Sequence, residues 1–477
     1  MNIRILISTL LLIGMTFLQG CGNCPEKAEG LELPITFAAP ERPAGQMDAI
    51  NLTVPAMDTV RIGIIGLGMR GPGAVDRLSY IDGTKIVALC DVHPERVEAC
   101  QKILEKKGRP RAEAYAGDYE IWKKLCERED IDLVYICTDW KTHTPMAVYA
   151  MEHGKNVACE VPIATSIDEC WQLVNTCEKT RKHCMMLENC CYDFFEMTTL
   201  NMAQKGLLGE IVHAEGAYIH DLRFLNFMDP KDGGYNDWWR LEFNKEHNGN
   251  YYATHGLGPV TQALNIGRGD RMTTLVAMAT DQFGMSEYAK AKFGAESEMA
   301  KQEYKKGDMV NTLIRTENGK TILIQHDVTS PRPYNRKHSL SGTKGYIEKY
   351  PRPGIALDPN ENNPVEFDNL SAHSFLSQEQ FDRIVTEYEH PITKEIGEFA
   401  KKVGGHGGMD FIMDYRLIYC LRNGLPLDMN VYDGVEWSCI GELTETSINN
   451  GYVPVAMPDF TRGAWKKLSG YTHAMAK

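Results

Sequence analysis

The sequence lacks a long apolar run, an excess of basic residues and cysteines at metal-ligand spacing. No internal stretch of its 477 residues approaches the roughly 20 apolar residues that a membrane-spanning helix needs. The formal net charge of −13 and the lack of a basic arm exclude nucleic acid as an expected partner. The 14 cysteines show no CxxC spacing beyond Cys24, so we expect neither a metal site nor a disulfide framework. Cysteines inside apolar runs, such as Cys90 and Cys159, are expected to be buried free thiols.

The N-terminus has the pattern of a bacterial export signal. Arg4 precedes an apolar stretch over 5–18, which is too short to cross a bilayer. The run Leu-Gln-Gly-Cys that ends at Cys21 resembles a lipobox, so we predict a signal peptide over 1–20 and acylation of Cys21. The protein would then belong to the cell envelope and contact the membrane only through its lipid anchor. A conventional signal peptide is the alternative, and it also places the protein outside the cytoplasm.

The chain is long enough for two cores, since single cores rarely exceed about 250–300 residues. Residues 21–58 are rich in Pro, Gly, Ala and charge, which predicts a flexible tether. From 59 to 188, β-branched runs alternate with helical stretches, as in βαβ units with a parallel sheet. From 189 to 477, strand-like runs follow one another, with an Asn-Gly hairpin signal at Asn318. We therefore predict an α/β protein, with a Rossmann parallel sheet and then an α+β domain whose sheet is mostly antiparallel. Two C-terminal helices should return to the interface, over 408–423 and 433–449.

A glycine motif lies where the first strand should end. Gly66, Gly68 and Gly71 form G-x-G-x-x-G between a buried strand and a helix, the context that makes the motif informative. Such a turn lets the backbone approach a pyrophosphate, and the helix N-terminus supplies unpaired N–H groups. Asp91 follows at the end of the second strand, where a carboxylate binds ribose hydroxyls and repels a 2′-phosphate. NAD is therefore the expected cofactor, and a glycine turn without a ligand is the alternative.

Two further segments resemble a known oxidoreductase superfamily. Trp140-Lys141-Thr142-His143 follows the third predicted strand, and Glu160-Val161-Pro162 follows the fourth. With the second domain, they look like the glucose–fructose oxidoreductase and inositol dehydrogenase superfamily. Its members usually carry Glu-Lys-Pro in the latter place, where the Lys binds or processes the substrate. Because Val161 replaces that Lys, the resemblance to a simple sugar dehydrogenase is weaker.

Glu-Val-Pro, together with three later segments, resembles glycoside hydrolase family 109, the NAD-dependent α-N-acetylgalactosaminidases. These segments are 216–222, 248–260 and 330–334, and the His-Gly-Leu-Gly-Pro block that starts at His255 is the most specific. The likeness runs from about Arg61 to the C-terminus. Ala253 departs from the pattern, because Pro is expected there.

The resemblance implies which residues bind NAD and which bind the sugar. Contacts with NAD are expected at Gly66, Gly68, Met69, Arg70, Asp91, Trp140, Lys141, Thr142, His143, Glu160, Val161 and Asn189. Contacts with the substrate are expected at Tyr218, Arg240, Tyr252, Ala253, Thr254, His255 and Tyr334. The alternatives are a core position for Tyr218, a stacking or interdomain ion-pair role for Arg240, and a structural role for His255.

The implied chemistry is glycoside cleavage through a transient oxidation, an exception to the usual mechanism with two carboxylates. NAD⁺ takes hydride from sugar carbon 3, the proton on carbon 2 becomes acidic, and the glycosidic oxygen leaves carbon 1. Water then adds, and the hydride returns. His255 is the predicted base for the carbon 3 hydroxyl, because its unperturbed pKa is near neutrality. Tyr252 is the predicted base at carbon 2, with Tyr334 as the second candidate. The pKa of a Tyr is near 10, so NAD⁺ or Arg240 would have to lower it.

The resemblance thus predicts a hydrolase of N-acetylgalactosamine-containing glycans that recycles NAD in each turnover. One alternative is an extracytoplasmic NAD-dependent sugar dehydrogenase. Another is a non-catalytic sugar-binding lipoprotein, against which the retention of both Tyr252 and His255 argues. The sequence leaves open whether the protein forms a homo-oligomer.

Overall fold

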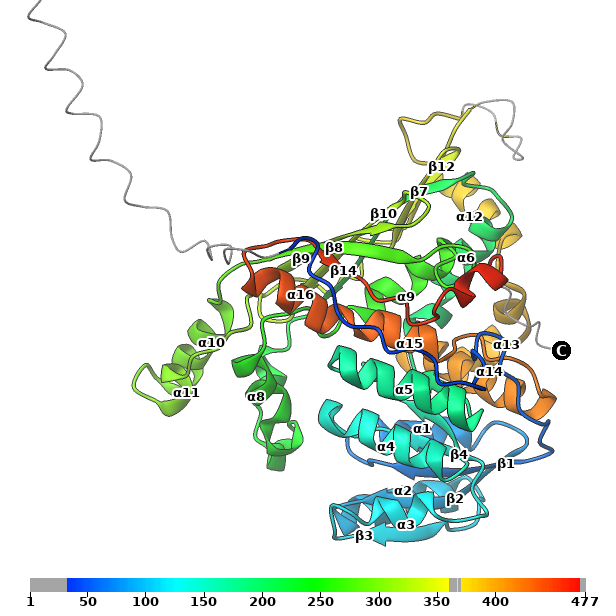
Figure 1. Ribbon diagram of the computed structural model, residues 1–477, viewed down its shortest axis with the longest axis vertical. Helices are drawn as coiled ribbons and strands as arrows, with labels where there is room; N and C mark the ends of the chain where they lie inside the picture. Colours follow the sequence, from blue (N-terminus) through cyan, green and yellow to red (C-terminus); the bar gives the residue numbers. More distant parts are fainter. Residues whose placement is uncertain (1–31, 360–366, 368–369, 472–477) are drawn as a thin grey trace, which may run out of the picture.

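The computed structural model describes residues 32–359, 367 and 370–471, which form two packed α/β bodies (Figure 1). The predicted signal peptide and Cys21 lie outside these residues. Within the described part of the chain, no helix is both long and apolar enough to cross a membrane.

The first body is the predicted Rossmann domain, with six strands in the order β3-β2-β1-β4-β5-β6, all parallel. The order reverses between β1 and β4, which opens the crevice where such sheets bind ligands. Its strands are β1 Val60–Ile65, β2 Thr84–Asp91, β3 Glu113–Ala116, β4 Leu133–Ile136, β5 Asn156–Cys159 and β6 Cys184–Met186. Its helices are α1 Gly71–Leu78, α2 Pro94–Lys106, α3 Trp122–Cys126, α4 Trp140–Glu152 and α5 Ile167–Thr180.

The second body contains an eight-stranded sheet in the order β13-β12-β11-β7-β10-β9-β8-β14. Only the pairing of β7 with β10 is parallel in this sheet, so the prediction of a mostly antiparallel sheet is confirmed. Its strands are β7 Ile211–Ile219, β8 Met272–Ala279, β9 Val310–Thr316, β10 Thr321–Asp327, β11 Ser339–Gly342, β12 Gly345–Glu348, β13 Gly354–Leu357 and β14 Val455–Ala456.

Helices cover one face of this sheet and connect it to the Rossmann body (Figure 1). The predicted helix over 408–423 is present as α14, whereas that over 433–449 is two helices that meet at Cys439. The α-helices are α6 Phe194–Gln204, α7 Arg223–Asn226, α8 Trp239–Glu246, α9 Thr254–Ala263, α10 Gly284–Phe293, α11 Glu298–Lys301, α12 Gln378–Glu387, α13 Pro391–Val403, α14 Met409–Asn423, α15 Val431–Ser438 and α16 Ile440–Asn449. The 3₁₀ helices are η1 Asn189–Tyr192, η2 Pro230–Asp232, η3 Asn236–Trp238, η4 His406–Gly408 and η5 Ala464–Lys467.

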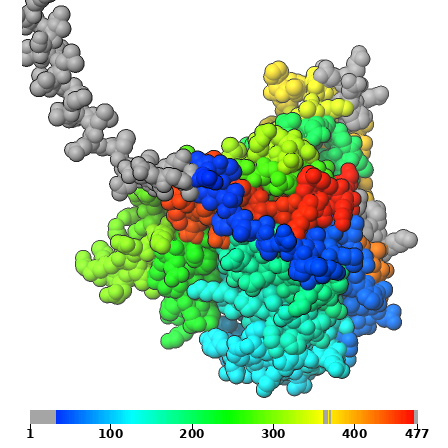
Figure 2. Space-filling model, viewed as in Figure 1, coloured from blue at the N-terminus to red at the C-terminus, as the bar shows by residue number. Residues whose placement is uncertain are grey.

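Residues 32–58, the N-terminal strap, correct the prediction of a flexible tether. The strap has almost no regular structure, but it lies flat along both bodies (Figure 2). Arg42 pairs with the buried carboxylate of Glu178 at 2.8 Å, and the N–H of Ala49 donates to the Tyr432 hydroxyl at 2.9 Å. Leu52 is buried, as are the apolar residues at 50 and 54. The composition predicted the lack of helix and strand correctly, but these alternating apolar side chains fix the segment by burial.

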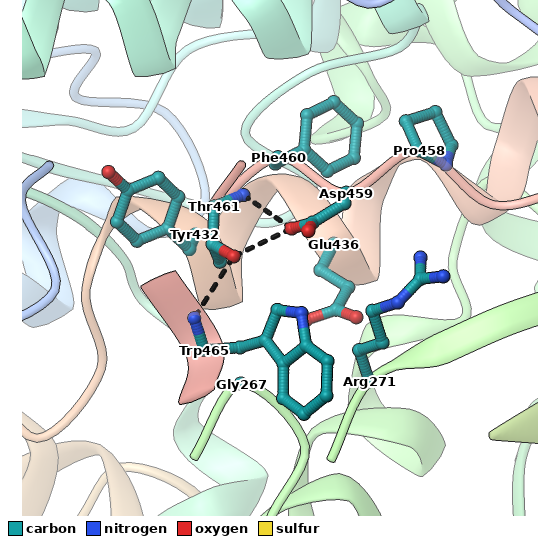
Figure 3. Close-up of a pocket in the computed structure, with 9 residues that line it drawn as sticks. All are labelled: Gly267, Arg271, Tyr432, Glu436, Pro458, Asp459, Phe460, Thr461 and Trp465. Carbon is teal, nitrogen blue, oxygen red and sulfur yellow. Dashed lines mark hydrogen bonds between the residues drawn. The ribbon is translucent and has the colours of Figure 1, made fainter. Parts of the chain in front are cut away.

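A small pocket lies under the C-terminal segment, away from the Rossmann crevice (Figure 3). Glu436 of α15 lines it, and burial, together with the charges of Asp433 and Asp459, raises the pKa of this carboxyl group to about 8. Arg268 pairs with Asp433 at 2.7 Å, and Arg271, which lines the pocket, pairs with Glu317 at 3.1 Å. Within the described residues Glu436 forms no ion pair, so its carboxyl group favours the neutral form.

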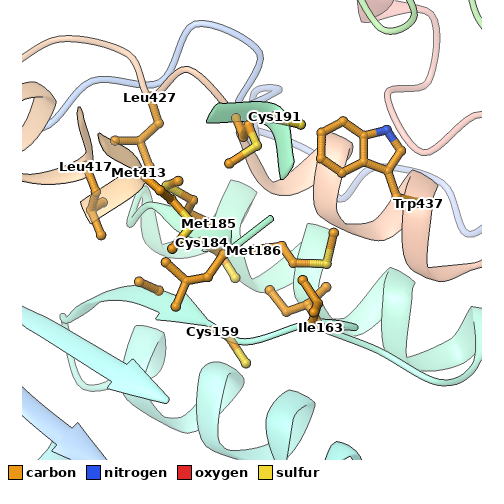
Figure 4. Packing of buried hydrophobic residues seen from close by; sticks show 14 of the residues in the cluster. Cys159, Ile163, Cys184, Met185, Met186, Cys191, Met413, Leu417, Leu427 and Trp437 are labelled. Atoms are coloured by element: carbon orange, nitrogen blue, oxygen red, sulfur yellow. The ribbon is translucent and has the colours of Figure 1, made fainter. Parts of the chain in front are cut away.

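One hydrophobic core runs from the Rossmann sheet into the helices of the second body (Figure 4). Cys159, Cys184 and Met186 pack near Met413 and Trp437, which belong to α14 and α15. The twelve cysteines in the described residues are free, and all except Cys137 are buried, as predicted for core thiols. Because the two bodies share this core, the crevice between them is held in one geometry.

The strap predicts a measurable loss of stability on truncation of one side chain. We expect Leu52→Ala to lower the free energy of unfolding by about 2–5 kcal/mol, because it removes buried apolar surface and leaves a cavity. Denaturant titration of the purified protein measures this difference. Met47→Ala is the control, since Met47 is 66% exposed and should be nearly neutral. Equal midpoints for the two variants would mean that the strap does not contribute to the folded state.

Glu436 predicts a pH-dependent difference in stability. Its pKa is higher in the folded state than in an unfolded chain, so the folded state binds the proton more tightly and loses stability as pH rises from about 4.5 to about 8. Glu436→Gln removes this dependence. We expect the stability of the variant relative to the wild type to increase over this pH window, as measured by denaturant titration at several pH values. A stability difference between the variant and the wild type that stays constant with pH would contradict a raised pKa of Glu436 in the folded state.

Candidate active site

The glycine loop joins β1 to α1 at the Rossmann crevice. Gly66 has φ +88°, and a Cβ there would lie 2.6 Å from the carbonyl oxygen of Cys137, so only glycine fits. A Cβ at Gly71 would lie 2.2 Å from the carbonyl oxygen of Gly66. At Gly68 the nearest atom is 3.6 Å away, and no side chain caps α1. The loop therefore leaves an open backbone face and free N–H groups at a helix N-terminus, which suit a pyrophosphate.

Asp91 lies at the end of β2, as predicted, and its carboxylate also fixes the glycine loop. It accepts hydrogen bonds from the N–H groups of Leu67 at 2.7 Å and His93 at 2.9 Å. Each carboxylate oxygen can accept a further hydrogen bond, so Asp91 can still bind ribose hydroxyls. Met69, at the tip of the loop, is half exposed.

Arg70, Glu160 and Asn189, three predicted cofactor residues, meet in one polar network. The guanidinium of Arg70 pairs with Glu160 at 2.7 Å and with Asp410 at 3.1 Å, and the Asn189 amide donates to Asp410 at 2.5 Å. Asp410 is on α14, and the sequence analysis missed it. Burial alone would raise the pKa of Asp410, but a hydrogen bond from His406 and the positive charge of Arg70 hold it well below its usual range. The network joins the C-terminal helices to the cofactor crevice.

The segments that follow β4 and β5 hold the next group of predicted residues, with Lys141, Thr142 and His143 in the first turn of α4. The Asp139 carboxylate caps α4 by accepting a hydrogen bond from the N–H of Lys141 at 3.0 Å. The Lys141 side chain is exposed. The Thr142 hydroxyl lies 2.7 Å from that of Thr138. His143 is buried, and its ring nitrogens lie 2.7 and 3.1 Å from the carbonyl oxygens of Pro162 and Thr138, so its ring ties the two loops together. Val161 is buried and brings no charge.

The predicted sugar-binding side chains gather in an aromatic box formed by Trp140, Tyr218, Tyr252, His255 and Tyr334. The Tyr252 ring stacks on Trp140 at 5.8 Å between centroids, and it lies 4.6 Å from Tyr218 and 4.9 Å from His255. The Tyr334 ring lies 6.3 Å from Tyr218, and its side chain is the exposed member of the box. Side chains from α4, β7 and α9 thus face one another across the crevice. Tyr218 is therefore a wall of the box, with its hydroxyl 2.9 Å from His220 Nδ1.

Arg240 lies behind the box as a stacked cation. Its guanidinium carbon is 4.8 Å from the Tyr252 ring centroid and 5.1 Å from that of Trp140, and it forms no ion pair within the described residues. Its guanidinium donates a hydrogen bond to the Tyr235 hydroxyl at 3.0 Å. Arg240 is 6% exposed, so it presents a nearly desolvated cation to the site.

Tyr252 does not have the lowered pKa that its predicted role as a base requires. Burial raises its pKa well above 10, the neighbouring Tyr218 adds to this shift, and Arg240 opposes it without reversing it. Of the two charges expected to lower this pKa, Arg240 is therefore not sufficient by itself. A further positive charge in the crevice would be needed.

His255 has a partner that sequence reasoning missed. Its Nδ1 lies 2.7 and 3.0 Å from the two carboxylate oxygens of Glu188, which is fully buried just after β6. Burial alone would raise the pKa of Glu188, but the charge and hydrogen bond of His255 hold it below its usual value. Glu188 is thus ionised and accepts the Nδ1 proton, so Nε2 is the acceptor nitrogen whenever the imidazole is neutral. Its position at the end of the last parallel strand was the only signal in the sequence.

Ala253 and Thr254 are buried at the start of α9, where they place His255. Ala253 has φ −67°, a value that Pro also adopts, so this departure from the expected pattern leaves the helix start unchanged.

Two family models match the chain. The model described as "Glycosyl hydrolase 109, C-terminal domain" matches residues 192–467, and that described as "Oxidoreductase family, NAD-binding Rossmann fold" matches residues 60–188. Among solved structures, an oxidoreductase domain protein from Kribbella flavida has a TM-score of 0.63 at 17% identity, covering 84% of this chain and 100% of that one. A levoglucosan dehydrogenase in complex with NADH and L-sorbose has a TM-score of 0.60 at 16% identity, with the same coverage. These two likenesses show the fold.

Curated relatives extend over the whole chain. Glycosyl hydrolase family 109 protein 1 from Bacteroides thetaiotaomicron is 55% identical over 477 residues, covering 99% of this chain and 100% of the relative. The family 109 protein from Porphyromonas gingivalis is 55% identical over 470 residues, covering 98% of each. The cofactor is NAD, for which the glycine loop and Asp91 fit, and the chain belongs to glycosyl hydrolase family 109.

Proposed function

We propose that the protein hydrolyses terminal N-acetylgalactosaminides, with the α-linkage favoured, through transient oxidation at sugar carbon 3. The choice of sugar rests on the family resemblance. The observation that supports the route is the hydrogen bond between Nδ1 of His255 and the carboxylate of Glu188, 2.7 Å long, at the wall of the aromatic box. It fixes Nδ1 of the imidazole and leaves Nε2 as the acceptor, which suits a base for a sugar hydroxyl.

Two carboxylates have charges that raise the pKa of Tyr252, and they are not arranged for the usual glycosidase mechanism. These are Glu160, which pairs with Arg70, and Glu188, which pairs with His255. A two-carboxylate mechanism needs one free carboxylic acid and one free carboxylate at the scissile bond. A redox-assisted route does not need them.

Bound NAD would supply the hydride acceptor, and later the donor, for carbon 3. His255 takes the proton of the carbon 3 hydroxyl, and Glu188 stabilises the imidazolium that forms. Oxidation of carbon 3 acidifies the proton on carbon 2, which Tyr252 removes as the glycosidic oxygen leaves carbon 1. Because burial keeps Tyr252 neutral, the positive charges of Arg240 and of the oxidised cofactor would have to act together on it. Tyr334, at the exposed rim, is the second candidate for this proton transfer.

The aromatic box would bind the sugar ring through its apolar face. Tyr218 and Tyr252 present large rings, and Arg240 presents a desolvated cation that can hold a polar substituent. Val161 leaves the site without the Lys of sugar dehydrogenases in this superfamily, which favours the hydrolase over an NAD-dependent sugar dehydrogenase.

The place of action remains a proposal from the sequence. Acylation at Cys21 would hold the protein in the cell envelope of a bacterium, with its glycan substrates outside the cytoplasm. Mass spectrometry of the membrane fraction would identify the lipidated residue.

The proposed route predicts a product without a change in net redox state. With a chromogenic α-N-acetylgalactosaminide, we expect free sugar and no accumulating NADH, because the hydride returns to carbon 3. In deuterated water, the product should carry deuterium at carbon 2. Stoichiometric NADH would instead indicate a dehydrogenase. Tyr252→Phe should abolish the deuterium exchange and Tyr251→Phe should retain it, since the Tyr251 hydroxyl bonds to Glu445.

The pairing of His255 with Glu188 predicts two graded losses of activity. We expect His255→Gln to lower kcat by about 10²–10⁴-fold, since it removes the general base. Glu188→Gln keeps a hydrogen-bond acceptor but removes the charge, so kcat should fall by about 10–100-fold with KM little changed. Steady-state kinetics measure both values.

The control for these two variants is His213→Gln, on β7, whose side chain contacts Thr321 outside the box. Its kinetics should match those of the wild type. A Glu188→Gln enzyme with unchanged kcat would show that the carboxylate has no role in positioning or charging His255.

A further inference from the structure

Three donor side chains converge at the base of the aromatic box. In the part of the chain that the structure describes, Glu188, Cys190 and His255 form the one group of at least three His, Cys or acidic residues placed to hold a metal ion. Their donor atoms all lie within 4.8 Å of one another. Glu188 and Cys190 come from the turn after β6, and His255 comes from α9. The proposed hydrolysis uses Glu188 and His255 but gives Cys190 no role.

The Cys190 thiol is buried, and its hydrogen bond is weak. Its Sγ lies 3.5 Å from Asn189 Oδ1, and its other neighbours include the carboxylate of Glu188. Carboxylate, thiolate and imidazole nitrogen are all ligands of zinc. Two anionic ligands would balance the charge of a divalent ion, which matters because an unbalanced charge at a buried position is costly.

We propose that Glu188, Cys190 and His255 form a site for a thiophilic divalent cation, Zn²⁺ or Cd²⁺, that inhibits the enzyme. The cation takes the place of the proton between Nδ1 of His255 and Glu188. The thiol proton of Cys190 leaves to solvent as the metal–sulfur bond forms, and the imidazole proton ends on Nε2. No electron is transferred.

The geometry requires only small shifts. Zinc–ligand distances of about 2.0–2.3 Å place tetrahedral donors about 3.3–3.8 Å apart. The distances from Nδ1 of His255 to the two carboxylate oxygens, now 2.7 and 3.0 Å, must lengthen slightly. The Sγ of Cys190, which lies within 4.8 Å of the other donor atoms, must move closer to them. Three protein ligands leave a fourth position for water. His255 also has the most exposed side chain of the three, so the box provides the path of entry.

Inhibition follows from the position of the imidazole proton. With the metal on Nδ1, Nε2 carries a proton and donates, so it can no longer accept the proton of the carbon 3 hydroxyl. The binding step needs only the three donors, whereas the inhibition rests on the proposed function.

Cadmium titration of the NAD-loaded enzyme tests the binding step. We expect the ultraviolet charge-transfer band of a cadmium–thiolate bond to saturate at one ion per chain. Cys190→Ala should lose this band. Cys191→Ala, at the adjacent buried cysteine that is not in the donor group, should retain it. A wild-type enzyme without the band, or a band that survives in Cys190→Ala, would overturn the site.

A second variant tests the site independently of whether Cys190→Ala folds. Glu188→Gln replaces a ligand with an isosteric amide, so it should keep the thiolate band but weaken cadmium binding by at least about 10-fold. Undiminished affinity in this variant would overturn the assignment of Glu188 as a ligand.

Zinc inhibition tests the second step and separates the two proposals. We expect Zn²⁺ to inhibit glycoside hydrolysis, and Cys190→Ala to need at least about 10-fold more zinc for the same fractional loss of its own zinc-free rate. A normal thiolate band without any hydrolysis would refute the proposed function and leave the site supported. Hydrolysis that is insensitive to zinc, with a normal band, would refute the inhibitory mechanism.

Discussion

The carboxylate of Glu188 is removed from water, and His255 is the group that compensates it. A buried carboxylate without a partner is strongly destabilising, so this pair constrains both segments that carry it. One segment follows the last Rossmann strand, and the other is the first turn of α9 under the second sheet. The pair therefore links the two bodies at the crevice. It also orients the imidazole with Nδ1 toward Glu188, so the same interaction connects the bodies and positions the ring.

The electrostatics of the box depend on the burial of the Arg240 side chain, which is only 6% exposed. Arg240 has no carboxylate partner within the described residues, and burial keeps Tyr252 neutral despite this nearby cation. Away from bulk water, a further positive charge near Tyr252 would act on it more strongly than in solution. The proposed proton transfer at Tyr252 would thus depend on the charge in the crevice, because burial keeps its phenol un-ionised. In the polar network of the glycine loop, Arg70 pairs with both Glu160 and Asp410.

The sequence predicted correctly where the residues expected to bind the cofactor lie in the fold. Gly66 and Gly68 follow β1 and Asp91 ends β2, because turns and strand ends are encoded within a few residues. Glu188 and Asp410 were missed because their partners, His255 and Arg70, are 67 and 340 residues away. The same distance hid the donor group with Cys190, since spacing rules detect metal ligands only when they are close in the chain. The packed strap shows the limit of composition, because the burial of its apolar side chains fixes it.

The strap also limits how far the enzyme can extend from a lipid anchor. An acylated Cys21 would be joined to the packed chain at residue 32, and eleven residue steps span on the order of 40 Å at full extension. A tether that continued to residue 58 would span on the order of 130 Å. If Cys21 carries the proposed lipid, a docked strap would therefore confine the crevice to a thin layer above the lipid surface. Substrates would then have to reach that layer, so the strap would select them by their height above the membrane, independently of their chemistry.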